Sequence, residues 1–158
     1  MSVKAGHAAV TKFLEREGVH YEVVEHERTQ TATAEARAAG LPPADVAKTV
    51  VLRDQEGVRL AVIPASERLD MHKVKRELKS TGLRLVTERE MADEFDDFEV
   101  GAVPPFGPMF HALALVDRRL LDHDHILCGG GDHEHGLLVD PKDIVQAGKA
   151  SVADICAD

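Results

Sequence analysis

A β-hairpin signal at residues 47–64 determines the fold class expected of this chain. The stretch reads AKTVVLRDQEGVRLAVIP, in which two runs rich in Val, Leu and Ile flank the turn-forming residues DQEG. Apolar runs of this length on both sides of a short polar turn predict two antiparallel strands. Hairpins favour a mixed sheet or a partly closed barrel over a purely parallel sheet.

Helices and further strands are expected along the rest of the chain. Helical spacing and caps predict helices that end at Gly18, Gly40 and Gly82, the last of them capped by Asp70. Further helices are predicted at residues 88–97 and 141–146, strands at 21–26, 83–87 and 110–117, and a strand pair at 125–131 and 136–140. The expected class is therefore α/β of the α+β type, a mixed and largely antiparallel sheet or partly closed barrel flanked by helices. Because no repeat or composition shift divides the chain, residues 1–158 are expected to form a single domain.

Composition narrows the range of partners. The net charge is -9, which argues against a protein that coats nucleic acid nonspecifically, and DNA is not an expected partner. The longest apolar runs fall short of the eighteen or so residues that a membrane span needs, and the first eighteen residues resemble a helix instead of a signal peptide. A cytoplasmic location without a membrane partner is expected. Cys128 and Cys156 lie far apart, outside any CxxC spacing, and indicate neither a disulfide framework nor a thiolate zinc site.

The histidine pairs are the feature most open to a metal interpretation. His123 alternates with His125, and His133 with His135, and alternation on a strand places two side chains on one face. Both pairs fall in polar stretches typical of turns, and neither comes with a third ligand at a recognisable spacing. Solvated turns are favoured, and no metal or other cofactor is expected.

Lys48 is a charged residue at a strand position where the hairpin pattern predicts an apolar one. Strand alternation puts its side chain on the same face as Val50 and Leu52, which should be the buried side. Such a lysine either extends its aliphatic stem to water at the end of the strand or faces a cleft as a cation. In a cleft it could hold a phosphate or a developing oxyanion.

The stretch VGAVPPFG, residues 100–107, predicts a stiff loop. Gly101 can adopt backbone angles closed to other residues, while Pro104 and Pro105 fix the neighbouring dihedral angles and Gly107 releases the chain. Such a loop either forms a rigid surface turn or presents free backbone N–H groups to a ligand at little reorganisation cost.

Three segments together resemble the YbaK/EbsC family of aminoacyl-tRNA deacylases, which is related to the editing insertion of bacterial prolyl-tRNA synthetases. The segments are AKTVVL, LAVIPASERLD and GAVPPFG, and the resemblance covers nearly the whole chain. In that family a lysine on an early strand faces a GxxxP loop, and Lys48 and the residues 101–105 match those positions. The stretch HERTQTATAEARAAG and the turn GGGDHEHG differ from the best-known cysteinyl-tRNA deacylases, so the identity of the edited amino acid is not carried over.

The resemblance implies a trans-editing hydrolase without a protein nucleophile or cofactor. Water or a group of the substrate would attack the aminoacyl ester, Lys48 would hold the terminal phosphate or ribose, and backbone amides from Gly101 onward would hold the carbonyl oxygen. The implied partner is the acceptor end of aminoacyl-tRNA, and a synthetase is a further partner that the resemblance allows. Lys73, Lys75, Arg76 and Lys79 make the helix after Asp70 the expected tRNA contact. The substrate-binding residues expected beside the cleft are His26, Thr31, Thr49, Ser66, Pro104, Pro105, Phe106, Gly107, Asp132 and His133, with Phe106 limiting the size of the aminoacyl group.

Two other functions stay open at this point. The same fold could serve as a noncatalytic module that binds a tRNA end or a small ligand, or the histidine pairs could belong to a metal-dependent hydrolase. Tight binding of aminoacyl-tRNA without turnover would favour the first, and deacylation that is insensitive to a chelator would exclude the second.

Overall fold

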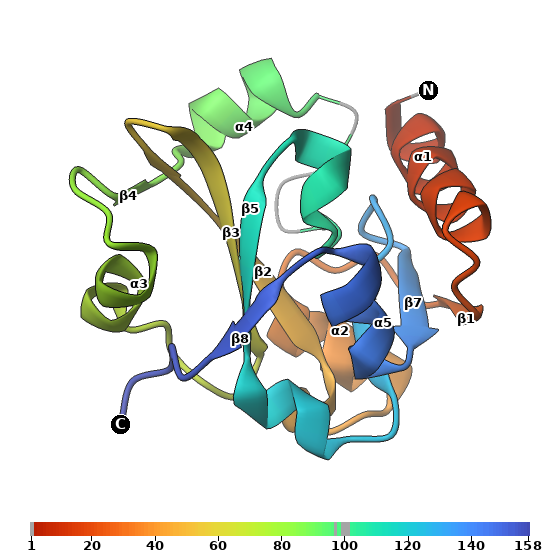
Figure 1. Ribbon diagram of the computed structural model, residues 1–158. Helices are drawn as coiled ribbons and strands as arrows, with labels where there is room; N and C mark the ends of the chain where they lie inside the picture. The colour runs from red at the N-terminus through yellow and green to blue at the C-terminus, as the bar shows by residue number, and fades with distance from the viewer. Residues whose placement is uncertain (1, 97, 99–101) are drawn as a thin grey trace.

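The computed structural model describes residues 2–96, 98 and 102–158 of the chain. Helices flank two β-sheets, and the N-terminal helix lies on the opposite side of the molecule from the C-terminus (Figure 1). The described α-helices are α1 (Ser2–Arg16), α2 (Ala32–Ala39), α3 (Met71–Leu78), α4 (Glu88–Glu94) and α5 (Pro141–Ala147). The strands are β1 (Tyr21–Glu25), β2 (Ala47–Asp54), β3 (Gly57–Pro64), β4 (Arg84–Leu85), β5 (Leu113–Asp117), β6 (Ile126–Gly129), β7 (His135–Val139) and β8 (Ser151–Ala153).

The strands form one five-stranded and one three-stranded sheet, in the orders β4-β2-β3-β5-β8 and β1-β7-β6. The expected hairpin is present as β2 and β3, paired antiparallel from Ala47 opposite Pro64 to Asp54 opposite Gly57. The pairs β3–β5 and β5–β8 are parallel, and the other described pairs are antiparallel. A bridge between Val46 and Leu127 links the two sheets. The expected mixed, largely antiparallel arrangement is therefore confirmed, and the sheets do not close into a barrel.

Local sequence signals explain most of the helix ends. Thr31 accepts a hydrogen bond from the Ala34 amide and begins α2, which ends at Gly40 with φ +72°. Asp70 caps α3 as expected, but that helix ends at Lys79 in the left-handed conformation and not at Gly82. The expectation for Gly82 was wrong because a lysine can adopt that conformation when its amide bonds the last turn.

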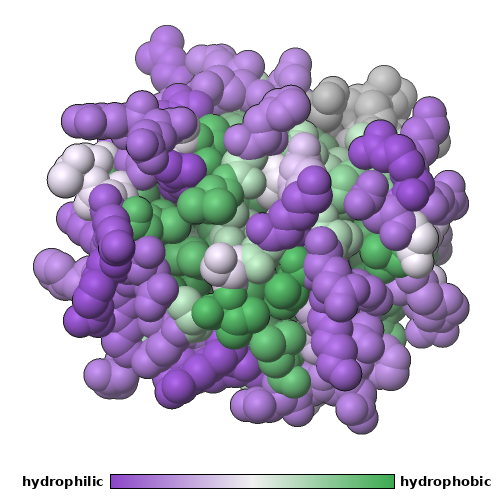
Figure 2. Space-filling view, viewed as in Figure 1, coloured by the Kyte–Doolittle hydropathy of each residue, from purple (hydrophilic) through white to green (hydrophobic). Residues whose placement is uncertain are grey.

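The core explains why the run LAVIP is apolar without interruption. Ala61 and Ile63 pack in a cluster with Leu52 and Val74, whereas Val62, between them, packs in the main cluster on the opposite face. Because β3 is central and covered on both faces, all five residues from Leu60 to Pro64 are buried. Figure 2 shows an apolar area in the middle of the face that carries β8 and α5, surrounded by hydrophilic side chains. Within the described residues, no helix combines the length and apolar character needed to cross a membrane.

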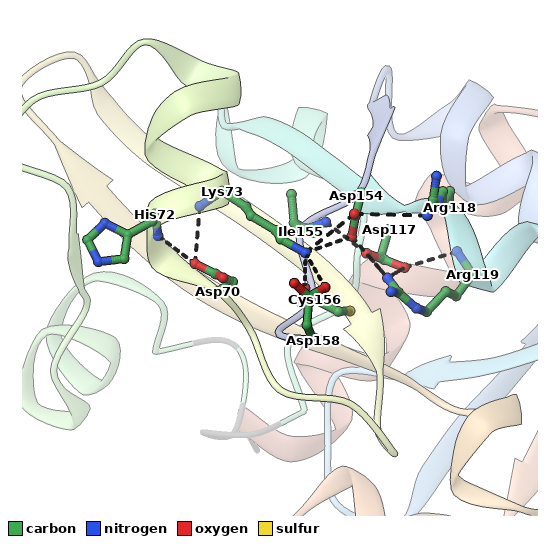
Figure 3. A network of polar contacts seen from close by, with 10 residues as sticks. All are labelled: Asp70, His72, Lys73, Asp117, Arg118, Arg119, Asp154, Ile155, Cys156 and Asp158. Atoms are coloured by element: carbon green, nitrogen blue, oxygen red, sulfur yellow. Dashed lines mark hydrogen bonds and ion pairs between the residues drawn. The ribbon is translucent and has the colours of Figure 1, made fainter.

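A polar network fastens the C-terminal segment to α3 and β5 (Figure 3). The Lys73 ammonium lies 3.0 Å from Asp158 and 3.4 Å from Asp154, and donates to the Cys156 carbonyl at 2.7 Å. The fully buried Asp117 carboxylate accepts the Ile155 amide at 2.9 Å. Burial alone would raise the pKa of Asp117, but hydrogen bonds from Ile155 and from the Arg119 backbone and side chain outweigh it and lower that pKa.

Candidate active site

A pocket of about 210 Å³ opens beside the edge of β2. Its wall combines consecutive residues of β2 with residues at β4, in α4 and in the segment after position 101. They are Lys48, Thr49, Val50, Val51, Leu85, Val86, Met91 and Val103. The wall is therefore mostly apolar, with two side chains, those of Lys48 and Thr49, that can donate hydrogen bonds.

The edge of β2 is open along this pocket. At one end Val46 bridges Leu127, and at the other the Val51 carbonyl accepts a hydrogen bond of 3.0 Å from the Val86 amide. Alternate residues of a strand direct their backbone groups to the same edge, so Thr49 directs its N–H and C=O to the side on which Val51 meets Val86. No described strand pairs with β2 at Thr49 on this side. A bound molecule therefore has a backbone donor and acceptor within reach.

Thr49 also contributes a buried hydroxyl. Its Oγ1 has no hydrogen-bond partner among the residues that the structure describes. Leaving such a group unpaired costs about 1 to 3 kcal/mol of stability, and native proteins rarely retain one without a reason. An unpaired hydroxyl on a pocket wall is the expected arrangement for a group that bonds a ligand.

Lys48 stands at the beginning of β2, at the end of the face that it shares with Val50 and Leu52. Leu52 is fully buried and Val50 packs against the same core cluster, as the alternation predicts, whereas the side chain of Lys48 is exposed. No carboxylate of the described chain pairs with Lys48. Its ammonium is therefore available to a phosphate or to a developing negative charge.

The loop from Ala102 to Gly107 is buried, not a surface turn. The Ala102 carbonyl accepts a hydrogen bond of 3.0 Å from Gly131, and a Cβ at Gly129 would lie 2.9 Å from the carbonyl oxygens of Ala102 and Val103. A side chain at Gly129 would therefore push the loop away from β6. Val103 is the loop residue on the pocket wall, and Gly101 lies outside the described residues.

The remaining loop residues that were expected in the site face the core. Phe106 is fully buried in the main cluster, where its ring packs on that of Phe13 with centroids 5.5 Å apart. Pro104 and Pro105 are buried, and Gly107, also buried, begins a short 3-10 helix. Pro104, Pro105 and Phe106, which were expected to limit the size of the aminoacyl group, do not line the pocket, whereas Val103 and Met91 do.

Three more of the expected site residues gather elsewhere, around a small polar hollow that Ala102 also lines. Thr31 and His133 line it together with Asp132 and Glu35. His26, whose side chain is 1% exposed, contacts Glu35 through Nε2 at 2.9 Å. Burial raises the pKa of Glu35, and the contact with His26 opposes that rise.

The structure places these groups on two sides of one loop. Ala102 lines the polar hollow and Val103 lines the β2 pocket, as neighbouring residues of an extended chain do. Lys48 and Thr49 thus share one pocket, and Thr31, Asp132 and His133 share the other. Ser66 is exposed on the turn after β3 and lines neither.

The cysteines offer no nucleophile. Both are free and buried, and burial raises the pKa of the Cys128 thiol and raises that of Cys156 to about 12. Both thiols are protonated at neutral pH and out of reach of a substrate.

One cluster in the described chain has the composition of a metal site. His7, Asp132 and His135 each offer a ligand atom, and these atoms lie within 4.8 Å of one another. Sequence reasoning missed His7 because it stands on α1, more than a hundred positions from the other two. Of the remaining histidines of the two pairs, His123 contacts Asp45 at 2.7 Å and His125 is exposed.

Residues 26–147 match the family described as the aminoacyl-tRNA editing domain. A structure described as that of a candidate trans-editing enzyme for prolyl-tRNA synthetase is 29% identical, with a TM-score of 0.86 over 97% of this chain and 98% of that one. A hypothetical protein is 28% identical, with a TM-score of 0.84 over 94% of this chain and 99% of that one. A structure from work on computational grafting of epitopes onto scaffold proteins is 27% identical, with a TM-score of 0.85 over 97% of each chain. No curated protein matches this chain.

Proposed function

Since the chain belongs to the aminoacyl-tRNA editing domain family, we propose that it hydrolyses the ester of mischarged aminoacyl-tRNA as a free-standing editing enzyme. The family match agrees with the resemblance drawn from the sequence. The likeness to a candidate trans-editing enzyme over nearly the whole of both chains supports a role in trans. The observation that carries the proposal is the β2 pocket, in which an exposed cation, a hydroxyl unpaired within the described chain and open backbone groups meet an apolar wall.

Each wall of the pocket suits one part of an aminoacyl-tRNA end. The Lys48 ammonium binds the phosphate or ribose of the terminal nucleotide, because it is exposed and has no competing carboxylate in the described chain. The Thr49 hydroxyl and the open backbone of β2 bond the polar groups next to the ester. Leu85, Met91 and Val103 enclose the aminoacyl side chain.

The reaction needs positioning and charge stabilisation instead of a protein nucleophile. Water, or a hydroxyl or thiol of the substrate, adds to the ester carbonyl carbon, and negative charge develops on the carbonyl oxygen. The bond between that carbon and the ribose oxygen then breaks, and the ribose oxygen leaves as a hydroxyl after taking up a proton. By the family resemblance the backbone amide at Gly101 stabilises the oxyanion. Because both thiols are buried and protonated, they do not compete for the role of nucleophile.

The apolar wall acts as the sieve of the editing reaction. An apolar pocket distinguishes one methylene by only about 1 to 3 kcal/mol, so a synthetase cannot reject smaller analogues by affinity alone. The loop that carries Val103 is packed against β6 through Gly129 and cannot retreat from a larger side chain without disturbing the sheet. The pocket therefore favours small aminoacyl groups.

The exposed basic residues of α3 contact the tRNA body. Lys75 and Arg76 are exposed, and α3 leads directly into β4, whose Leu85 lines the pocket. Lys73 does not belong to this surface, because its ammonium is held by the C-terminal acids. The surface of α3 that contacts tRNA thus includes fewer basic residues than the helix sequence predicts.

A deacylation screen across mischarged tRNAs tests the proposal. The untagged protein should release the amino acid from at least one mischarged tRNA faster than from the correctly charged one, with and without a chelator. Binding of every aminoacyl-tRNA without release would favour the noncatalytic module instead. Release that stops on addition of a chelator would favour a metal-dependent hydrolase.

A further inference from the structure

The turn before β7 lies against the first half of α1, although more than a hundred residues separate them (Figure 1). Gly131, at φ +94°, makes this contact: a Cβ there would lie 2.6 Å from the Gly6 carbonyl carbon and 2.8 Å from the His7 nitrogen. A side chain at Gly131 would therefore hold the two segments apart. Their close approach brings His7 to the residues of the turn.

The contact places the His7 ring over that of His135. The ring centroids are 4.2 Å apart and the planes differ by 15°. His7 Nδ1 lies 2.8 Å from the Gly130 carbonyl oxygen, and that oxygen can only accept a hydrogen bond. Nδ1 of His7 is therefore the protonated nitrogen, and the lone pair that can bind a metal ion is on Nε2.

Asp132 supplies the third ligand of the set. Its carboxylate lies 2.8 to 2.9 Å from His135 Nδ1, and Oδ1 accepts the Glu134 and His135 amides at 2.9 Å each. These amides orient the carboxylate, and an ion bound by Asp132 and His135 would replace the contact between Oδ2 and His135 Nδ1. Both features, a histidine bonded to a backbone carbonyl and a carboxylate held by backbone amides, are typical of the surroundings of metal ligands.

We propose that His7, Asp132 and His135 bind one divalent transition-metal ion, with Zn²⁺ as the best match, that ties α1 to the β6–β7 turn. Two imidazoles and a carboxylate suit Zn²⁺, Co²⁺ and Ni²⁺ better than Mg²⁺ or Ca²⁺, which prefer oxygen ligands. One ligand atom from each residue lies within 4.8 Å of the others, so small side-chain movements suffice to close the set. The ion has a structural role, because none of the three residues lines the pocket that holds Lys48.

Titration of the untagged, metal-stripped protein with Zn²⁺ or Co²⁺ tests the site. One equivalent should bind, and Co²⁺ should give the visible absorption of a bound ion. At a hundredfold excess over Kd the Tm should rise by about 5 to 10 °C. Even residues that merely support metal ligands contribute about 10- to 100-fold in affinity, so His7→Ala should weaken binding at least that much.

Two further variants distinguish ion binding at these three residues from ion binding elsewhere on the surface. Asp132→Asn keeps an oxygen for the backbone amides but removes the carboxylate, and should also weaken binding. The matched control is His125→Ala, which removes an exposed histidine from a different acidic hollow, formed with residues such as Glu22 and Asp143. The proposal is overturned if the wild type binds no ion at millimolar Zn²⁺, if His7→Ala binds as tightly as the wild type, or if His125→Ala abolishes binding. In the first case the stacked rings are a packing contact alone.

Discussion

Replacing Thr49 by Val should stabilise the protein and slow the reaction. The two side chains have nearly the same shape, but Val removes a buried hydroxyl that has no partner in the described chain. Because an unpaired hydroxyl costs about 1 to 3 kcal/mol, the free energy of unfolding should rise by about 1 kcal/mol or more. For a chain of this size that corresponds to a rise of about 2 to 4 °C in Tm for each kcal/mol.

The same substitution removes a hydrogen bond to the substrate. A net value of about 0.5 to 1.5 kcal/mol for that bond corresponds to a loss of about 2- to 12-fold in kcat/KM. The assays are thermal unfolding and deacylation of the best substrate, with Thr33→Val, at an exposed position of α2, as the matched control. A less stable Thr49→Val protein would show that the hydroxyl is paired after all, and an unchanged kcat/KM would show that it does not touch the substrate.

Three further predictions concern the core, the acid response and the tRNA surface. Phe106→Ala should lower the free energy of unfolding by about 3 to 5 kcal/mol, as for other buried aromatic residues. The ratio of deacylation rates for small and large aminoacyl groups should stay the same, and a changed ratio would show that the ring limits the size of the substrate. The pKa of Asp117 is below its ordinary value of 3.8, so its contribution to stability is present above that pH and is lost as the pH falls through the lower, folded-state pKa. Urea unfolding between about pH 2 and 6 should therefore show a shallower acid loss in Asp117→Asn, and an identical pH dependence would refute this. Replacing Lys75 and Arg76 together by Ala should raise KM at moderate salt and reduce its salt dependence, and a KM that stays unchanged at every salt concentration would place the tRNA on another surface.

The sequence predicted the features of the fold that depend on neighbouring residues. The β2–β3 hairpin and the caps at Thr31 and Asp70 follow from turn residues and side chains within a few positions. The parallel strand β8 was not predicted, because three residues carry too little pattern to identify a strand. The strand β4 was expected over five residues and has two.

Some of the residues that line the β2 pocket stand out in the sequence and others do not. Lys48 stood out because a charge broke the apolar alternation of a strand, and Thr49 is its neighbour. Met91 carried no such signal, because it is an ordinary apolar helix residue that becomes a pocket wall only when α4 packs beside β2. The burial of Phe106 could not be predicted either, since the direction of its side chain depends on the packing of Phe13 from α1. For Lys73 the sequence predicts a free surface lysine, but its ammonium forms ion pairs with Asp154 and Asp158 near the C-terminus.

The most direct test of the account is the deacylation rate of Lys48→Ala. If the ammonium binds the terminal phosphate or ribose, kcat/KM should fall by about 10- to 160-fold, which corresponds to about 1.5 to 3 kcal/mol for a hydrogen bond to a charged group. Tm should stay within a degree or two of the wild type, because the side chain is exposed. Lys142→Ala, at an exposed lysine of α5 that does not line the pocket, should keep full activity. A Lys48→Ala protein that releases amino acid as fast as the wild type would contradict the assignment of the β2 pocket as the active site.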